Sequence, residues 1–425
     1  MQRKSLYQYG VFALPLSFVG LPLYLYIPDL YATQFGLSLT TIGLLLLAIR
    51  FIDALQDPII GTLTATLPNN KSKLRNTLLC SVAVLIIGMF LLLEPMANIS
   101  VALWFAVSMV ICTTAFSVLS ILYQSVGAIW KKDYFERTTI TTAREAFGLL
   151  GVMLAAILPS VLMQYYPAKQ AFEIFFFVFT ALIVFASCIW LAWLGKTKFE
   201  DSGSQYSFSF FSILKSAQTR PFFVVWFASQ LASAIPVILV IFFIRDRLQL
   251  ENLTGLFLLT YFFSGIVGML IWQKAQAKFS KQQLWQAAMA LAVASFLWAF
   301  FLGVGDAIGF TLVCVFSGIA LGGELAIPPS ILADKISGAK ASADSTKFFA
   351  ISTFLSKFAL ALASGLVLPL LASNGYSPVT KNSDSALLAL AFFYALLPCI
   401  IKASAFLYLT RLKLEDKNYD NRNKN

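Results

Sequence analysis

The chain contains no histidine, and charged residues make up only 12% of it. Without imidazole, any catalysis, metal binding or proton transfer would have to use carboxylates, lysine or tyrosine. The five cysteines stand singly in apolar runs and lack the spacing of a metal or redox pair, so we expect small core residues and no cofactor. The sequence shows no nucleophile–base pair and no phosphate-binding loop, so we do not expect an enzyme.

Hydrophobic residues instead account for 59% of the 425 positions. Soluble domains carry about 25% charged residues, so this composition indicates a protein embedded in a lipid bilayer. The net charge of +11 does not indicate nucleic-acid binding, because the basic residues are spread over short loops between apolar runs. Basic loops of that kind act as orientation signals in membrane proteins.

Apolar stretches long enough to cross a bilayer, which needs about 20 helical residues, recur along the chain. We therefore predict an all-α membrane protein with twelve transmembrane helices in two six-helix halves. The first stretch is too long for the core of a signal peptide and is expected to be retained. The expected spans are 9–33, 39–67, 75–94, 99–129, 140–165, 170–195, 221–246, 252–273, 283–304, 308–336, 346–373 and 384–411.

The longest polar stretch, 197–220, is a linker by composition. It separates an N-terminal half at 1–196 from a C-terminal half at 221–411, with a tail at 412–425. Most of the 31 Lys and Arg residues fall at the termini and in the even-numbered connections. This bias predicts that both termini and the linker lie on the cytoplasmic side of the cytoplasmic membrane. Two six-helix halves joined in this way resemble the major facilitator fold, whose solute site lies at mid-membrane between the halves.

The second expected span carries Arg50, Asp53 and Asp57 in a run otherwise as apolar as lipid. Spacings of three and four residues put them on one face of a helix. Each charge at bilayer depth costs at least about 2.5 kcal/mol on insertion scales, so charges kept there are usually functional. Two carboxylates one turn apart can ligate a hard cation such as sodium or share a proton, while Arg50 balances the charge. We predict a coupling-ion site; the alternative is an ion cluster that only packs helices.

The fourth expected span adds polar side chains, among them Ser117, Ser120, Tyr123 and Gln124. Serine hydroxyls can complete the coordination of a cation or bind a solute, although they often bond to carbonyls of their own helix.

A charged loop with Asp133, Glu136 and Arg137 follows the fourth span, and we expect it to be solvated and to act in gating. Arg144 lies several residues inside the next apolar helix. Its guanidinium can present a planar fork of donors to a polar solute, or it can pair with Glu145.

In the second half, Glu324 precedes the pair Pro328 and Pro329, which is expected to break its helix. A broken helix at membrane depth is tolerated where it lines a cavity, so Glu324 is predicted to bind the solute or to cap the interrupted helix. Asp334 follows and is grouped with the gating residues.

Two lysines lie inside later spans. Lys357 falls near the bilayer centre and needs a counter-charge, for which Asp53 and Asp57 are the best candidates. Lys402 is expected to extend its ammonium group to the membrane interface.

These motifs resemble the glycoside–pentoside–hexuronide:cation symporters, the melibiose-permease-like branch of the major facilitator superfamily. The resemblance spans nearly the whole chain and rests mainly on the runs 50–61, 133–138 and 323–334. It implies symport of a sugar or related solute with sodium, lithium or protons, in which each ligand favours binding of the other. Carried over to this chain, it implies cation ligands at Asp53, Asp57, Gln56 and Ser117, with Arg144 near the solute and Lys357 near the cation.

The sequence departs from melibiose-type transporters at Ser17 and Ser120, which stand where those proteins have sugar-binding acids. Neutral hydroxyls bind sugar hydroxyls more weakly than carboxylates do, so we expect a small, sugar-like solute rather than a disaccharide. An amphiphilic or lysolipid-like substrate stays open, as does a non-transporting sensor or partner subunit. The expected partners are a small-molecule solute, the coupling cation and the lipid bilayer, with no nucleic acid and a monomeric chain.

Overall fold

The computed structural model describes residues 3–37, 39–96, 99–131, 133–199, 210–338, 344–376 and 382–412. All regular elements in these ranges are helices. Residues 200–209 of the predicted linker and 413–425 of the predicted tail lie outside them.

The first half of the chain forms seven α-helices and one short 3-10 helix. They are α1 (Arg3–Gly10), α2 (Ala13–Thr33), α3 (Leu39–Leu63), η1 (Leu67–Asn69), α4 (Lys71–Leu93), α5 (Val101–Trp130), α6 (Tyr134–Tyr165) and α7 (Ala168–Lys196). The second half adds α8 (Phe210–Lys215), α9 (Arg220–Phe242), η2 (Phe243–Arg247), η3 (Glu251–Leu253), α10 (Thr254–Ala275), α11 (Lys281–Phe300), α12 (Ala307–Gly338), α13 (Ser345–Ser373), α14 (Asp384–Ala391), η5 (Phe392–Leu396) and α15 (Leu397–Thr410).

The predicted fold class is confirmed. Ten helical segments of the described residues are long and apolar enough to cross a membrane. With the long helices α2 and α3 they agree with the twelve expected spans. The first expected span is divided, because α1 ends at Gly10 and α2 begins at Ala13 with Pro15 in its first turn, where a missing N–H is tolerated.

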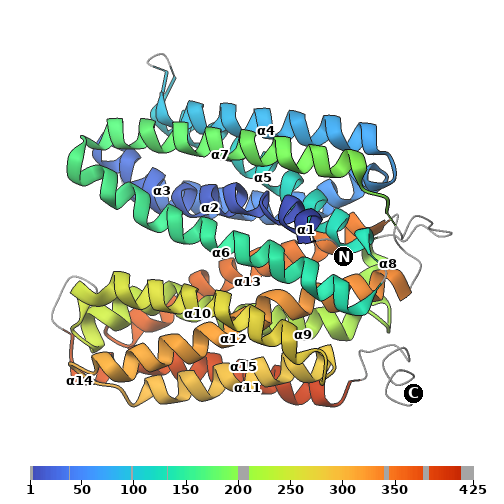
Figure 1. Cartoon of the computed structure of the whole chain (residues 1–425). Helices are drawn as coiled ribbons and strands as arrows, with labels where there is room; N and C mark the ends of the chain where they lie inside the picture. Colours follow the sequence, from blue (N-terminus) through green and yellow to red (C-terminus); the bar gives the residue numbers. More distant parts are fainter. Residues whose placement is uncertain are drawn as a thin grey trace. The chain divides into compact units, whose positions relative to one another are not determined.

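The helices pack as two compact units. Unit 1 contains Met1–Phe210 and Ile336–Phe354, and unit 2 contains Phe211–Lys335 and Leu355–Asn425. In unit 1, α2 packs on α6, α3 on α5, and α4 on both α5 and α7, and Figure 1 shows α4 beside α7. In unit 2, α15 packs on α9 and α11. The domain boundaries expected at residues 196, 220 and 411 stay a prediction.

An aromatic cluster ties α1 to α5 in unit 1. The rings of Tyr9 and Tyr123 stack with centroids 4.6 Å apart. Each hydroxyl donates to the backbone carbonyl of the other residue, at 3.0 Å from Tyr9 and 2.9 Å from Tyr123. A Cβ at Gly127 would lie 2.0 Å from the Tyr9 hydroxyl, so this close contact requires glycine.

The expected helix break at Pro328 and Pro329 is wrong, because α12 continues through both prolines from Ala307 to Gly338. Its backbone lies very close to α10 just before the prolines: a Cβ at Gly318 would be 2.3 Å from the Tyr261 carbonyl oxygen, and one at Gly322 2.4 Å from that of Gly265. In membranes, neighbouring helices can support a helix that proline would otherwise interrupt.

Gly151 marks a similarly close approach between α6 and α2, because an added Cβ would lie 2.2 Å from the backbone oxygen of Leu14. Backbone cannot yield as a flexible side chain can, so Gly151→Ala is expected to lower the free energy of unfolding by about 1 to 3 kcal/mol. Thermal unfolding of the purified protein measures this. The matched control is Gly20→Ala in α2, where an added Cβ meets nothing within 4 Å. Equal stability of the two variants would contradict the prediction.

Candidate functional site

The two acids of the second span lie on one side of α3 and are withdrawn from solvent. Asp53 is 6% exposed and Asp57 is fully buried. The helix that carries them packs against α5. Because burial of a carboxylate is costly without compensating groups, their partners determine what the site can do.

Three of the four residues predicted to bind the cation are joined by hydrogen bonds. The Oδ1 atom of Asp53 accepts from the Gln56 Nε2 at 2.9 Å and from the Ser117 Oγ at 3.2 Å. Gln56 lies one turn further along α3, whereas Ser117 comes from α5. The fourth residue, Asp57, lies one turn beyond Asp53 on the same helix.

A residue that sequence reasoning missed completes this group. The Thr114 hydroxyl of α5 donates to the Gln56 Oε1 at 2.7 Å. Its position three residues before Ser117, and thus on the same face of α5, was a signal that could have identified it.

The two predicted charge-balancing residues lie in different units. Arg50 is half-buried on α3, one turn before Asp53. Lys357 lies on α13 in unit 2, so its predicted pairing with Asp53 or Asp57 stays a prediction.

The predicted solute-binding residues of α2 and α5 have different surroundings. Ser17 is half-buried beside α6, where a Cβ added at Gly148 would lie 3.0 Å from its hydroxyl. Ser120 and Gln124 are half-buried on α5. Tyr123 is 2% exposed and belongs to the aromatic cluster, with its hydroxyl bonded to the carbonyls of Tyr9 and Gly10. The hydroxyl proton of Tyr123 is thus already shared with these carbonyls, and solute binding by Tyr123 stays a prediction.

Arg144 adopts the second of its two predicted arrangements. It is 4% exposed, and its Nε and Nη2 atoms donate to the Oε1 of Glu145 at 2.8 and 2.6 Å. Its charge is therefore paired within α6, and its contact with the solute stays a prediction.

Glu324 lies in a buried ionic network that links three helices of unit 2. The Lys402 ammonium of α15 donates to the two oxygens of Glu324 at 2.7 and 2.6 Å and to the Ser233 hydroxyl of α9 at 2.9 Å. That hydroxyl donates in turn to Glu324 at 3.2 Å.

This network corrects one expectation. Lys402 is only 6% exposed, so the prediction that it extends to the membrane interface is wrong. A carboxylate within hydrogen-bond reach compensates the buried ammonium more directly than distant water does. The side chain of Glu324 is likewise held by Lys402 and Ser233, and the unbroken α12 has no interrupted end for it to cap.

The region expected to be a solvated gating loop is largely helical. Asp133 caps α6 by accepting from the backbone N–H groups of Phe135 and Glu136 at 2.9 and 3.1 Å, so the helix begins at Tyr134. Arg137 is 3% exposed, and its Nε donates to the Lys131 carbonyl at 2.8 Å. The expectation of a loop is therefore wrong from Tyr134 onward, because the aspartate cap starts α6 there. Arg137 is buried, whereas Asp133 and Glu136 are half-buried, and the gating role of all three stays a prediction.

The remaining predicted gating residue, Asp334, joins α12 to the start of α11. Its carboxylate lies 2.6 Å from the ammonium of Lys281, which is fully buried. A fully buried ammonium depends on such a partner.

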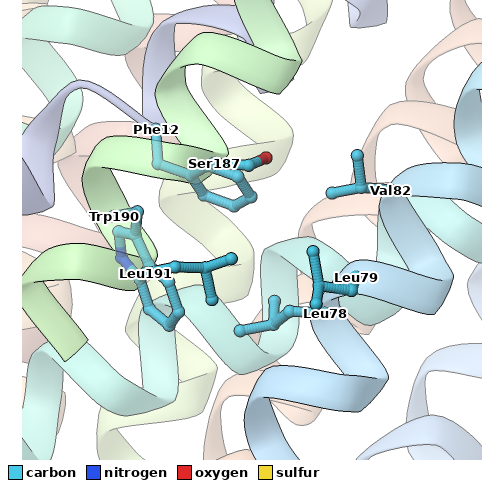
Figure 2. Close-up of a pocket in the computed structure, with 7 residues that line it drawn as sticks. All are labelled: Phe12, Leu78, Leu79, Val82, Ser187, Trp190 and Leu191. Atoms are coloured by element: carbon cyan, nitrogen blue, oxygen red, sulfur yellow. The ribbon is translucent and has the colours of Figure 1, made fainter. Parts of the chain in front are cut away.

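Two cavities lie away from these groups. Figure 2 shows the first, a crevice where side chains of α4 and α7 face each other; its volume of about 10 Å³ has room for about one water molecule. The second measures about 240 Å³. Neither cavity is lined by a residue predicted to bind the solute. The first is lined by Phe12, Leu78, Leu79, Val82, Ser187, Trp190 and Leu191, and the second by Leu30, Gln34, Phe35, Leu93, Lys169, Phe172 and Glu173.

Known proteins resemble this chain over most of its length. An uncharacterized symporter of Bacillus subtilis (strain 168), YnaJ, is 23% identical over an alignment of 445 positions, which covers 99% of this chain and 93% of that protein. A variant of the E. coli fucose:proton symporter, FucP, aligns with a TM-score of 0.67 at 14% identity, over 97% of this chain and 98% of that chain. A bacterial homologue of the iron transporter ferroportin, in an outward-facing state, aligns with a TM-score of 0.72 at 11% identity. The alignment covers 97% of this chain and 100% of that chain.

At these identities the solved structures show a shared fold and nothing more. The family assignment rests on a separate match, between residues 7–416 and the MFS/sugar transport protein family. Because this match spans nearly all the described helices, the chain belongs to the MFS/sugar transport protein family and is a multi-pass integral membrane protein.

Proposed function

We propose that this protein is a secondary active transporter that couples sodium or proton movement to symport of a small organic, sugar-like solute by alternating access. The observation that carries the proposal is the burial of Asp53 and Asp57 on one side of α3, with Asp53 bonded to groups from two helices. The similar protein of Bacillus subtilis supports it, since that protein is named a symporter. The melibiose-permease-like branch is the proposed place of the chain within its family.

The chemistry of the site suits a small cation. The carboxylates of Asp53 and Asp57 and the hydroxyl of Ser117 are oxygen donors, which hard cations prefer. A carboxylate can also accept a proton, so the same site can carry a proton in place of a metal cation. Binding of either ion neutralises part of the charge at membrane depth, and a solute that binds better to the neutralised site is thereby coupled to the ion.

We propose solute-binding roles for Ser17, Ser120, Tyr123, Gln124 and Arg144 of unit 1, and for Glu324 of unit 2. Most of these groups are neutral hydrogen-bonding side chains, which suits a hydroxylated solute. Asp133, Glu136, Arg137 and Asp334 are the proposed gating residues. We propose a monomer in the cytoplasmic membrane with both termini in the cytoplasm.

Uptake into proteoliposomes with an imposed sodium or proton gradient tests the proposal. The panel contains labelled monosaccharides, disaccharides and lysolipids, and an ionophore that collapses the gradient is the control. Gradient-dependent accumulation of a monosaccharide-sized solute is expected. Accumulation of lysolipids alone would favour the amphiphilic substrate, and no gradient-dependent accumulation of any compound would favour a non-transporting role.

Within that panel, disaccharides are expected to bind poorly. Ser17 and Ser120 offer neutral hydroxyls, and hydrogen bonds to ionised acceptors are roughly twice as strong as neutral ones. Competition of each disaccharide against the transported monosaccharide measures this. A disaccharide that competes better than the monosaccharide would contradict the prediction.

A further inference from the structure

Thr114 and Ser117 bring two hydroxyls of α5 to one acid of α3 by different routes. The Ser117 hydroxyl donates directly to Asp53 at 3.2 Å. The Thr114 hydroxyl reaches the same Oδ1 atom through Gln56, by a bond of 2.7 Å to the amide oxygen and one of 2.9 Å from the amide nitrogen. The resemblance that identified Ser117 assigns nothing to Thr114.

We propose that Thr114 is a positioning residue of the cation site, which acts on Asp53 entirely through Gln56. The proposal rests on the proposed function, because it needs an ion to bind at the acids of α3. It predicts that loss of the Thr114 hydroxyl weakens ion binding although Thr114 contacts neither acid in the described hydrogen bonds.

The direction of the two bonds supports this role. A glutamine amide has a donor end and an acceptor end. A hydroxyl that donates to the acceptor end turns the donor end toward Asp53. The amide nitrogen then holds one carboxylate oxygen of Asp53 in place and so fixes the orientation in which the carboxylate meets an ion.

The length of the glutamine side chain makes this support necessary. Gln56 is half-buried and has three rotatable bonds, so an unsupported amide samples several orientations. The bond to Thr114 on a neighbouring helix selects one of them before the ion arrives. A preorganised ligand shell binds more tightly than one that must be ordered on binding.

The chain offers a matched control one residue away. Thr113 has the same side chain, but its hydroxyl donates to the carbonyl of Val110 in its own helix at 3.3 Å. Thr113→Val therefore removes a buried hydroxyl from α5 without touching Gln56. Thr114→Ser keeps the donor and should restore binding.

The test titrates the purified full-length protein with sodium chloride against choline chloride, and separately with protons, and follows the fluorescence of its 8 tryptophans. Thr114→Val is expected to weaken the ion response of the wild type by about three- to tenfold, where tenfold corresponds to about 1.4 kcal/mol. Thr113→Val and Thr114→Ser should respond like the wild type. In a Gln56→Met background, Thr114→Val should have no further effect, since the two residues act in series.

The possible failures are distinct. If Asp57→Asn loses the ion response but Thr114→Val titrates like the wild type, the proposed function stands and the role of Thr114 is wrong. If Thr114→Val weakened ion binding equally in the wild type and in the Gln56→Met background, the proposed role of Thr114 would also be wrong. The effect would then not pass through the Gln56 amide. If Asp57→Asn responds like the wild type, or if the wild type responds to neither ion, the proposed function fails and this inference fails with it.

Discussion

Asp57→Asn is expected to abolish gradient-driven uptake while leaving folded protein in the membrane. Asparagine keeps the shape of the fully buried side chain but removes its charge. At a separation of about 4 Å and an effective dielectric constant of about 20, a unit charge attracts a cation by about 4 kcal/mol. Loss of that attraction corresponds to about a thousandfold lower ion affinity, which would place half-saturation far above usable sodium concentrations.

Uptake in proteoliposomes at matched protein content measures the effect, and thermal unfolding shows that the variant is folded. Asp384→Asn is the control, because Asp384 is an exposed acid in the first turn of α14. It should transport like the wild type. Normal accumulation by the Asp57 variant would remove the coupling-ion site from the mechanism.

Removal of one partner from the ionic network of unit 2 is expected to have the largest effect on stability. Glu324→Gln leaves the Lys402 ammonium buried without a counter-charge, since the two side chains are only 11% and 7% exposed. Breaking a buried pair in this way costs about 3 to 5 kcal/mol. Replacing both partners together, as Glu324→Leu with Lys402→Met, should be far less damaging and could even stabilise, because no charge is then buried.

Thermal or denaturant unfolding of the purified variants measures these differences. The matched control is the pair Glu94 and Lys169, whose side chains lie 3.1 Å apart but are 46% and 59% exposed. Glu94→Gln should cost about 1 kcal/mol or less. If Glu324→Gln were as mild as this control, the Lys402 ammonium would have to reach water readily, contrary to the packing of α9, α12 and α15.

The double variant also separates stability from transport. If it folds well but no longer transports, Glu324 and Lys402 have a role beyond holding three helices together, as the predicted solute role of Glu324 requires. If it folds and transports normally, the network serves packing alone.

Several corrections share one physical cause. Considered without its neighbours, the helix of Lys402 is expected to place this lysine at the membrane interface. In the same way, Pro328 and Pro329 predict a break in α12. Lys402 instead meets a carboxylate from α12, and α12 lies against α10 at Gly318 and Gly322. The role of the Thr114 hydroxyl was not predicted either, because its partner Gln56 lies 58 residues earlier in the chain, on another helix.

The sequence by itself determined what depends on short-range pattern. The length of its apolar runs specified a twelve-helix membrane protein, and the three- and four-residue spacing of Arg50, Asp53 and Asp57 put them on one helix face. The tertiary structure alone decided that the Thr114 hydroxyl reaches Gln56, which carboxylate neutralises Lys402, and that α12 passes through Pro328 and Pro329. These outcomes depend on contacts between helices far apart in the chain, and local periodicity carries no information about which helices meet.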